Sequence, residues 1–246
     1  MPDRADDRVA ALPGERTLRY RHALTVCDGF LAPTPVGPAR ARGVVVLHPW
    51  TGVASFVRDR ARRLAHAGYT AFAADLYGAG VRPTHIAGMR SESEKYLADP
   101  GLLRRRVQAG FDAFTDHTGL RPEDVIVLGY CFGGTAALEF ARSGARCAGV
   151  VSVHGTPLLH HPSDAASITA PLLIQTGAED ELVPDTLLAA LVADFRTAPE
   201  LDWQLTVHSG APHAYTAPGD RYRERADARS WRQLLDFLGE VAPLHA

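Results

Sequence analysis

The sequence predicts an α/β fold in which a mostly parallel, doubly wound sheet is flanked by helices. Short, continuously apolar and β-branched runs recur along the chain, and such runs are typical of strands that are covered on both faces. Longer helical stretches lie between these runs, and several of them end at glycine. Strands that alternate with helices in this order form a doubly wound sheet within one domain.

The individual elements can be placed along the chain from these patterns. We expect an edge strand at residues 17–25, buried strands at residues 43–47, 70–74, 125–128, 148–153 and 172–175, and a further strand at residues 203–207. Helices are expected at residues 54–67, 102–117, 133–143, 184–195 and 226–241. Residues 77–93 and 154–170 break the alternation. Both segments follow strands and are expected to line a pocket, because ligands in doubly wound folds bind at the carboxyl ends of strands.

Composition and charge limit the classes of protein to which the chain can belong. The chain has 246 residues and a net charge of -2, which gives no reason to expect nucleic acid or an anionic membrane as a partner. No apolar run approaches the roughly 18 residues of a membrane span, and the first residues lack the apolar core of a signal peptide. Three cysteines at long spacings favour a reduced, cytoplasmic protein. We expect residues 1–16 to form a flexible tail and residues 17–246 a single domain, as a monomer or a homodimer.

Cys131 stands at the centre of Gly129-Tyr130-Cys131-Phe132-Gly133, between an apolar strand and a helix. This is the nucleophile-elbow pattern of α/β-hydrolases, in which small residues two positions on either side of the nucleophile avoid a collision at a strained turn. The positive N-terminal end of the helix favours a thiolate, and the N–H of Phe132 is available to stabilise an oxyanion. The alternative is a structural cysteine in a glycine-rich turn. The strand, the helix and the partners downstream favour a nucleophile.

The partners of this cysteine are expected later in the chain, because the triad of α/β-hydrolases follows the order nucleophile, acid, base. The turn after the last buried strand holds Glu179, Asp180 and Glu181, and the pattern G-x-x-D-x-x-V-P selects Asp180 as the acid. His213 lies in the loop after the final strand and is the candidate base, with His208 as its rival. An imidazole next to a thiol forms a thiolate–imidazolium pair, and the carboxylate orients the imidazole. No His, Cys and Asp residues have metal-ligand spacing, so no metal is expected.

These residues resemble the dienelactone hydrolase family. The similarity covers residues 44–238 and rests on ADLYG at 74–78, GYCFGG at 129–134, GAED at 177–180 and HAY at 213–215. The resemblance implies an α/β-hydrolase fold and hydrolysis of an ester or lactone, without a cofactor, by a triad of Cys131, Asp180 and His213. The second N–H of the oxyanion hole, beside that of Phe132, would come from Trp50.

Two positions depart from the family's pattern. After the first buried strand the family usually carries a glutamate that contacts the resting thiol and takes part in its activation, and Pro49 stands there in this chain. Activation would then fall to His213, alone or with help from His48. The family also holds a substrate carboxylate with arginines, one of them shortly after the catalytic histidine, and here no arginine follows His213 before Arg221, although Arg82 or Arg90 could reach a pocket. We therefore expect a neutral, more aromatic pocket, with His48, Tyr77, Arg82, His154 and Tyr215 as its candidate residues.

Three functions are compatible with these residues. The first is a hydrolase that cleaves an ester or lactone through an acyl-enzyme on Cys131. The second uses the same acyl-enzyme for acyl transfer or cyclisation in a biosynthetic pathway. The third is a non-catalytic ligand-binding protein on a hydrolase scaffold, since a fold does not determine a function. The presence of all three triad residues favours the first, so small-molecule esters or lactones are the expected partners.

Overall fold

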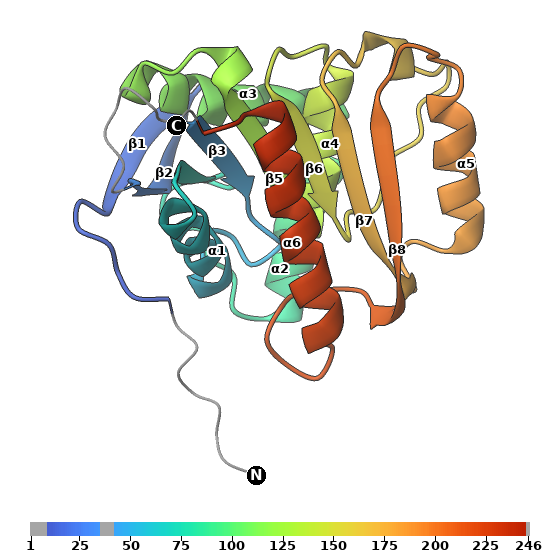
Figure 1. Ribbon diagram of the computed structural model, residues 1–246. Helices are drawn as coiled ribbons and strands as arrows, with labels where there is room; N and C mark the ends of the chain where they lie inside the picture. The colour runs from blue at the N-terminus through green and yellow to red at the C-terminus, as the bar shows by residue number, and fades with distance from the viewer. Residues whose placement is uncertain (1–8, 35–41, 245–246) are drawn as a thin grey trace.

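A computed structural model describes residues 9–34 and 42–244 of the chain, and a mostly parallel sheet runs through its centre (Figure 1). The described strands are β1 (Arg16–His22), β2 (Thr25–Ala32), β3 (Arg42–Leu47), β4 (Tyr69–Ala74), β5 (Val125–Tyr130), β6 (Gly149–Val153), β7 (Leu172–Glu179) and β8 (Trp203–Pro212). They lie in the order β1-β2-β4-β3-β5-β6-β7-β8. The β1–β2 and β2–β4 pairs are antiparallel, and every pair from β4 to β8 is parallel.

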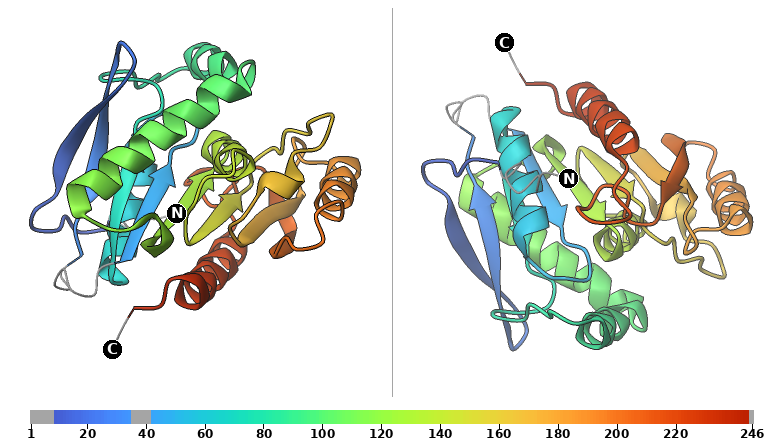
Figure 2. Two further views of the ribbon diagram at one scale, coloured as in Figure 1. Left: turned by 90° about the horizontal axis from the view of Figure 1, so that it is seen from above. Right: turned by 90° about the horizontal axis from the view of Figure 1, so that it is seen from below.

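Helices cover both faces of this sheet, as the views from above and below show (Figure 2). On one face lie α1 (Ser55–His66) and α6 (Glu224–Val241), whose apolar side chains share a core cluster with the sheet. On the other face lie α3 (Pro100–Thr118), α4 (Phe132–Arg142) and α5 (Asp185–Phe195), which share a second cluster. Helix α2 (Ile86–Leu97) contacts α3. The predicted doubly wound α/β fold is confirmed.

Strand β3 shows why the central strands are apolar at every position. Val44 and Val46 belong to the cluster beneath α1 and α6, whereas Val45 and Leu47 belong to the cluster beneath α3 and α4. Successive side chains of a strand point to opposite faces, so a strand that is covered on both faces leaves no side chain in water. This burial makes the middle of the sheet a rigid support for the loops at its ends.

Two predicted elements differ from the structure. The edge strand expected at residues 17–25 is a hairpin, because the chain turns at Ala23, with φ of 52°, and returns as β2. Asp28 and Gly29 interrupt the apolar pattern of β2 and hide that strand in the sequence. The segment 77–93, expected to be irregular, contains the first part of α2, whose N-cap residue His85 makes no side-chain capping bond. A helix without a capping side chain carries no start signal in its sequence.

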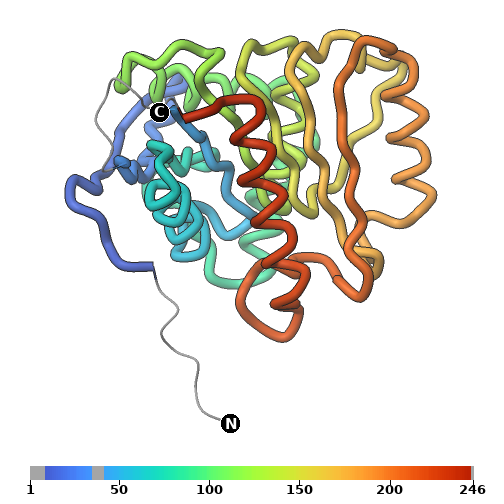
Figure 3. The backbone as a smooth tube through the Cα atoms, in the orientation of Figure 1, coloured from blue at the N-terminus to red at the C-terminus, as the bar shows by residue number. Residues whose placement is uncertain are grey.

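The edge strands of the sheet are β1 and β8, and the backbone trace follows the chain between them (Figure 3). The tail expected at residues 1–16 lies partly outside the described residues. In its described part, Glu15 accepts from Nε of Arg62 in α1 at 2.8 Å.

Because β3 to β8 are parallel, their carboxyl ends all lie on one side of the sheet, which is the lower side in Figure 1. The loops on this side hold most of the residues that the sequence singles out. Cys131 directly follows β5, His154 follows β6, Asp180 follows β7 and His213 follows β8. The fold therefore brings together side chains that are far apart in the sequence.

Candidate active site

Cys131 lies in a strained turn between β5 and α4. Its φ and ψ angles are 55° and -119°, a conformation that residues with a side chain rarely adopt. A Cβ atom on Gly129 would lie 1.8 Å from the carbonyl oxygen of Gly133, and a Cβ atom on Gly133 would lie 2.2 Å from that of Leu47. The two glycines therefore allow the turn to close against the backbone, and the turn leaves Cys131 half-buried at the N-terminus of α4.

Cys131, His213 and Asp180 form one hydrogen-bonded chain. Sγ of Cys131 lies 3.2 Å from Nε2 of His213. Nδ1 of His213 lies 3.1 Å and 3.0 Å from the two carboxylate oxygens of Asp180. Asp180 and His213 are 4% and 8% exposed, so water competes little for these bonds.

The rival acids and the rival base lie outside this chain of hydrogen bonds. Glu181 pairs with Arg221 at the surface, and Glu179 is exposed. His208 packs against Tyr215, with the two ring centroids 5.3 Å apart. The structure thus brings Asp180 and His213, and neither of the neighbouring carboxylates, to the cysteine.

The surroundings of His213 favour its protonated form. Burial alone would lower its pKa, but the hydrogen bonds with Asp180 and Cys131 outweigh burial and raise the pKa of His213 to about 10. An imidazolium between a carboxylate and a sulfur atom is the arrangement in which a cysteine and a histidine exist as an ion pair. The arrangement can supply both a nucleophile and a proton at neutral pH.

His48 directly follows β3 and holds the peptide bond between Pro49 and Trp50. The backbone N–H of Leu76 donates to Nε2 of His48 at 3.0 Å, so the ring proton is on Nδ1, which lies 2.7 Å from the carbonyl oxygen of Pro49. Burial lowers the pKa of His48 to about 4, which keeps the ring neutral. The peptide is trans, and its N–H and C=O point in opposite directions. The N–H of Trp50 is therefore turned away from His48.

Aromatic rings surround this loop. The hydroxyl of Tyr77 donates to the carbonyl oxygen of Trp50 at 3.2 Å, and the ring of Tyr77 lies 4.7 Å from that of His48 and 5.5 Å from that of Phe132. Burial, and after it the charge of Cys131, raises the pKa of Tyr77, so its hydroxyl keeps its proton. Apart from His213, the rings near Cys131 are therefore uncharged.

Arg82 is bound to its own loop and to two neighbouring segments of the chain. Its Nη1 lies 2.6 Å from the carbonyl oxygen of Val81 and 3.4 Å from Oδ1 of the buried Asp75. Its Nε donates to the carbonyl oxygen of Val53 and its Nη2 to that of Asp28, each at 3.2 Å. All the nitrogens of this guanidinium have partners within the protein, so its contacts are those of a residue that holds the loop rather than a substrate.

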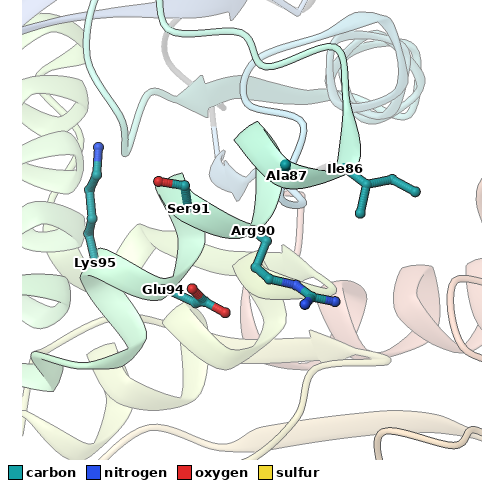
Figure 4. A pocket seen from close by; sticks show the side chains of 6 residues that line it. All are labelled: Ile86, Ala87, Arg90, Ser91, Glu94 and Lys95. Atoms are coloured by element: carbon teal, nitrogen blue, oxygen red, sulfur yellow. The ribbon is translucent and has the colours of Figure 1, made fainter.

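Arg90 lies on the exposed side of α2. It lines a hollow of about 590 Å³ together with Ile86, Ala87, Ser91, Glu94 and Lys95 (Figure 4). Cys131, Asp180 and His213 do not line this hollow. Arg90 therefore belongs to a surface separate from the triad.

His154 and Tyr215 lie behind the triad, and the structure does not place them in the wall of a pocket. Their exposures are 1% and 0%. The ring of His154 lies 5.3 Å from that of His213 and 5.4 Å from that of Tyr215. Rings that are buried in this way support the residues around them and do not contact a substrate. The positions of both rings depend on contacts between distant segments, which no local sequence pattern signals.

The three cysteines are free thiols with different surroundings. Burial raises the pKa of Cys27 and raises that of Cys147 to about 12. Cys131 is the thiol with a histidine at hydrogen-bond distance in the part of the chain that the structure describes.

Within residues 9–34 and 42–244, no group of three or more His, Cys, Asp or Glu side chains could hold a metal ion. Over the same ranges, none of the helices has the length and apolar character that crossing a bilayer requires.

Comparisons with known proteins find similar sequences and structures. A model of the dienelactone hydrolase family matches residues 28–242. The chain is 27% identical over 216 residues to a protein of Bradyrhizobium sp named "Probable 2-oxo-3-(5-oxofuran-2-ylidene)propanoate lactonase", with 83% of this chain and 86% of that protein covered. A solved structure, a dienelactone hydrolase-like promiscuous phosphotriesterase from metagenomic libraries, is 34% identical with a TM-score of 0.86, and 92% of this chain and 98% of that one are covered. A dienelactone hydrolase from Anabaena variabilis, 21% identical, shares the fold with a TM-score of 0.72 over 93% of this chain and 98% of that one.

Proposed function

The chain belongs to the dienelactone hydrolase family, and on that premise we propose that it is a cysteine-dependent hydrolase that cleaves an ester or lactone through an acyl-enzyme. One observation carries this proposal. Sγ of Cys131, the ring of His213 and the carboxylate of Asp180 form an unbroken chain of hydrogen bonds. A nucleophile, a base and an orienting acid in this order are the parts that acyl transfer to a side chain requires.

The first half of the proposed reaction forms a thioester. The thiolate of Cys131 attacks the carbonyl carbon of the substrate, and the carbonyl π electrons move to oxygen. Backbone N–H groups of Phe132 and Trp50 stabilise this oxyanion; the N–H of Phe132 lies in the first turn of α4 and has no acceptor within that helix. The C–O bond then breaks, and Nε2–H of His213 protonates the leaving oxygen. In a lactone the leaving oxygen remains attached to the acyl group.

The second half hydrolyses the thioester. His213, now neutral, takes a proton from water, and the resulting hydroxide attacks the acyl carbon. The C–S bond breaks, the carboxylic acid leaves, and Cys131 and His213 are again thiolate and imidazolium. Asp180 keeps the imidazole in one orientation throughout.

We assign the activation of Cys131 to His213 alone. Proline has no side-chain proton acceptor, so Pro49 cannot act as the family's glutamate does. His48 has both ring nitrogens bound to backbone groups, those of Leu76 and Pro49. Nε2 of His213 is already at hydrogen-bond distance from the sulfur.

The proposed substrate is a small ester or lactone with an uncharged acyl group. Arg82, an arginine that could hold a substrate carboxylate, is bound to its own loop, to Val53 and to Asp28 of β2. Tyr77 and Phe132, both buried, pack their rings 5.5 Å apart beside the turn that holds Cys131, so the side chains there other than those of the triad are aromatic and uncharged. A suitable panel contains an aryl ester, a neutral lactone, a carboxylated lactone and, because one relative is described as a promiscuous phosphotriesterase, a neutral phosphate triester.

The test replaces the nucleophile and a matched cysteine. Cys131→Ala should reduce hydrolysis of 4-nitrophenyl acetate to the uncatalysed rate, whereas Cys147→Ala, the same change at a thiol of raised pKa, should leave the rate unaltered. Mass spectrometry of the stopped wild-type reaction should find the acyl group on the peptide that contains Cys131. Turnover by Cys131→Ala would overturn the proposal. Binding without turnover by the wild-type protein would favour a ligand-binding protein, and an acylated alcohol or amine acceptor would indicate acyl transfer.

A further inference from the structure

His154 has no part in the proposed reaction, yet it contacts both the nucleophile and the base. It follows β6 with φ of 42°, in a region that residues other than glycine rarely adopt. Its backbone N–H donates to the carbonyl oxygen of Gln175 at 2.7 Å, which continues the pairing of β6 with β7 beyond the end of β6. The ring is 1% exposed. A buried ring on a strained backbone beside the triad points to a function of the ring itself.

Two hydrogen bonds determine the tautomer of His154. The backbone N–H of Cys131 is shared between two acceptors, the carbonyl oxygen of Val153 at 3.0 Å and Nδ1 of His154 at 3.1 Å. A backbone N–H can only donate, so Nδ1 is the acceptor and the ring proton is on Nε2. Nε2 lies 2.8 Å from Oγ1 of Thr216 and therefore donates to this hydroxyl. The ring thus connects the backbone of the nucleophile to the side chain of Thr216.

Thr216 belongs to the loop that presents the base, three residues after His213. The backbone carbonyl oxygen of Thr216 accepts from Nη2 of Arg60 at 2.7 Å. Arg60 is itself buried and paired with Asp227 of α6 at 2.7 Å. The loop is therefore held from the α1 side by Arg60 and from the triad side by His154.

The ring of His154 also contacts the base directly. Its centroid lies 5.3 Å from that of His213, with an angle of 66° between the two planes. Burial, and after it the charge of His213, lowers the pKa of His154 well below its usual value. A neutral ring at this place packs against an imidazolium without the repulsion that a second cation would introduce.

We propose that His154 is a positioning residue, which holds Sγ of Cys131 and Nε2 of His213 at hydrogen-bond distance through its bonds to the Cys131 N–H and the Thr216 hydroxyl. It does this without touching the substrate. The inference rests on the proposed function, because the cysteine that His154 positions is the proposed nucleophile.

Three single variants separate positioning from packing. His154→Phe keeps an aromatic ring and removes both hydrogen bonds. Thr216→Val keeps the shape of its side chain and removes only the bond to the base loop. His208→Phe is the matched control, because His208 is also buried and also packs its ring against Tyr215, at 5.3 Å, but lies outside the triad.

The first readout is the rate at which iodoacetamide alkylates Cys131 at mildly acidic pH, followed by peptide mass spectrometry. Burial raises the pKa of Cys27 and Cys147, so the label at the Cys131 peptide is resolved from slow background. The second readout is the separation of kcat from KM for an aryl ester. We expect His154→Phe and Thr216→Val each to lower the alkylation rate and kcat by about 10- to 100-fold, with little change in KM.

A double variant, a rescue variant and the control variant give three further expected results. The double variant should lose no more than the larger single loss, since both changes break one connection. Thr216→Ser, which restores the hydroxyl, should recover most of the rate. His208→Phe should remain near wild type in both readouts even if its melting temperature falls. If folded Thr216→Val alkylates and turns over at the wild-type rate, the positioning role is wrong; this variant decides the question even if His154→Phe does not fold.

The failure of this inference can be told apart from failure of the proposed function, because alkylation reports on Cys131 without any substrate. Ester hydrolysis by Cys131→Ala, together with slowed alkylation in Thr216→Val, would remove the proposed function and leave the positioning role. If Cys131→Ala is inactive and Thr216→Val is alkylated at the wild-type rate, the proposed function stands and the positioning role is wrong.

Discussion

Sγ of Cys131 and Nε2 of His213 lie 3.2 Å apart, so the proposed nucleophile and the proposed base are paired by a direct hydrogen bond. The turn of β5 into α4 positions the sulfur, and the loop after β8 positions the ring. A further carboxylate is not needed to hold the thiol proton, which is consistent with a proline at position 49 in a chain that keeps Cys131, Asp180 and His213. This pairing has consequences for the pH dependence of the reaction.

Acylation should persist to unusually high pH. The leaving oxygen takes its proton from the imidazolium of His213, whose pKa is raised to about 10, so the protonated form is present below that pH and is lost above it. We expect the alkaline limb of kcat/KM for an aryl ester near pH 10, measured with the uncatalysed rate subtracted. Asp180→Asn removes a stabilising hydrogen bond and should move the limb to lower pH. A wild-type limb near the ordinary histidine pKa of about 6.5 would count against this account.

Asp180 should be distinguishable from its two neighbours by the same substitution at each position. Asp180→Asn should lower kcat by roughly 10³- to 10⁴-fold, because an amide no longer holds the imidazole in its working orientation and tautomer. Glu179→Gln and Glu181→Gln are the matched controls, since Glu179 is exposed and Glu181 pairs with Arg221 at the surface. Steady-state kinetics of the three variants makes the comparison. Equal losses at all three positions would mean that the turn as a whole, and not Asp180, is required.

The proximity of Cys131, Asp180 and His213 could be predicted from the sequence because each of these residues has a local signal. Cys131 lies between glycines after an apolar strand, and Asp180 and His213 lie in turns after late strands. Parallel strands then bring these turns to one edge of the sheet, so three local patterns are enough to predict one site.

The supporting residues could not be predicted in the same way. Nε2 of His48 accepts a hydrogen bond from the backbone N–H of Leu76, 28 positions away in the sequence. Nε2 of His154 is hydrogen-bonded to the hydroxyl of Thr216, 62 positions away. Their roles exist only after the sheet has formed, and the residue type alone is equally compatible with a pocket wall. Strand β2 has no clear signal in the sequence for another reason: Asp28 and Gly29 break its apolar pattern, and the structure shows the N–H of Asp28 bonded to the buried carboxylate of Asp75.

His48 should make the protein sensitive to acid. Burial lowers its pKa to about 4 in the folded state, so the unfolded chain binds its proton first as the pH falls. The neutral ring contributes its full stability above a pH of about 6.5. As the pH falls to about 4, the free energy of unfolding decreases by about 3 kcal/mol.

Urea unfolding of His48→Asn across this range tests the expectation. Its slope of unfolding free energy against pH should be shallower than in the wild type, though not flat, because His154 and His208 also have lowered pKa values. His85→Asn, at an exposed histidine, should keep the wild-type slope. An unaltered slope in His48→Asn would show that this ring titrates normally.

Arg82 should matter for stability and not for substrate charge. Arg82→Ala removes its hydrogen bonds to the loop and to the buried Asp75, and we expect a loss of about 2 kcal/mol or more in unfolding free energy. The ratio of kcat/KM between a neutral and a carboxylated lactone should stay unaltered. Arg90→Ala, at the exposed face of α2, is the control and should alter neither quantity (Figure 4). A selective loss of activity on the carboxylated lactone would instead assign Arg82 to the substrate.

Pro49 gives a direct test of how the thiol is activated. In Pro49→Glu a carboxylate stands where the family usually has one, and a negative charge near the sulfur disfavours the thiolate. We expect iodoacetamide to alkylate Cys131 more slowly in Pro49→Glu at mildly acidic pH. Pro49→Ala, which removes the ring without adding charge, should alkylate at nearly the wild-type rate. Faster alkylation or a higher kcat in Pro49→Glu would show that His213 does not suffice and that the carboxylate assists it, because an added negative charge can speed the reaction only by accepting the thiol proton.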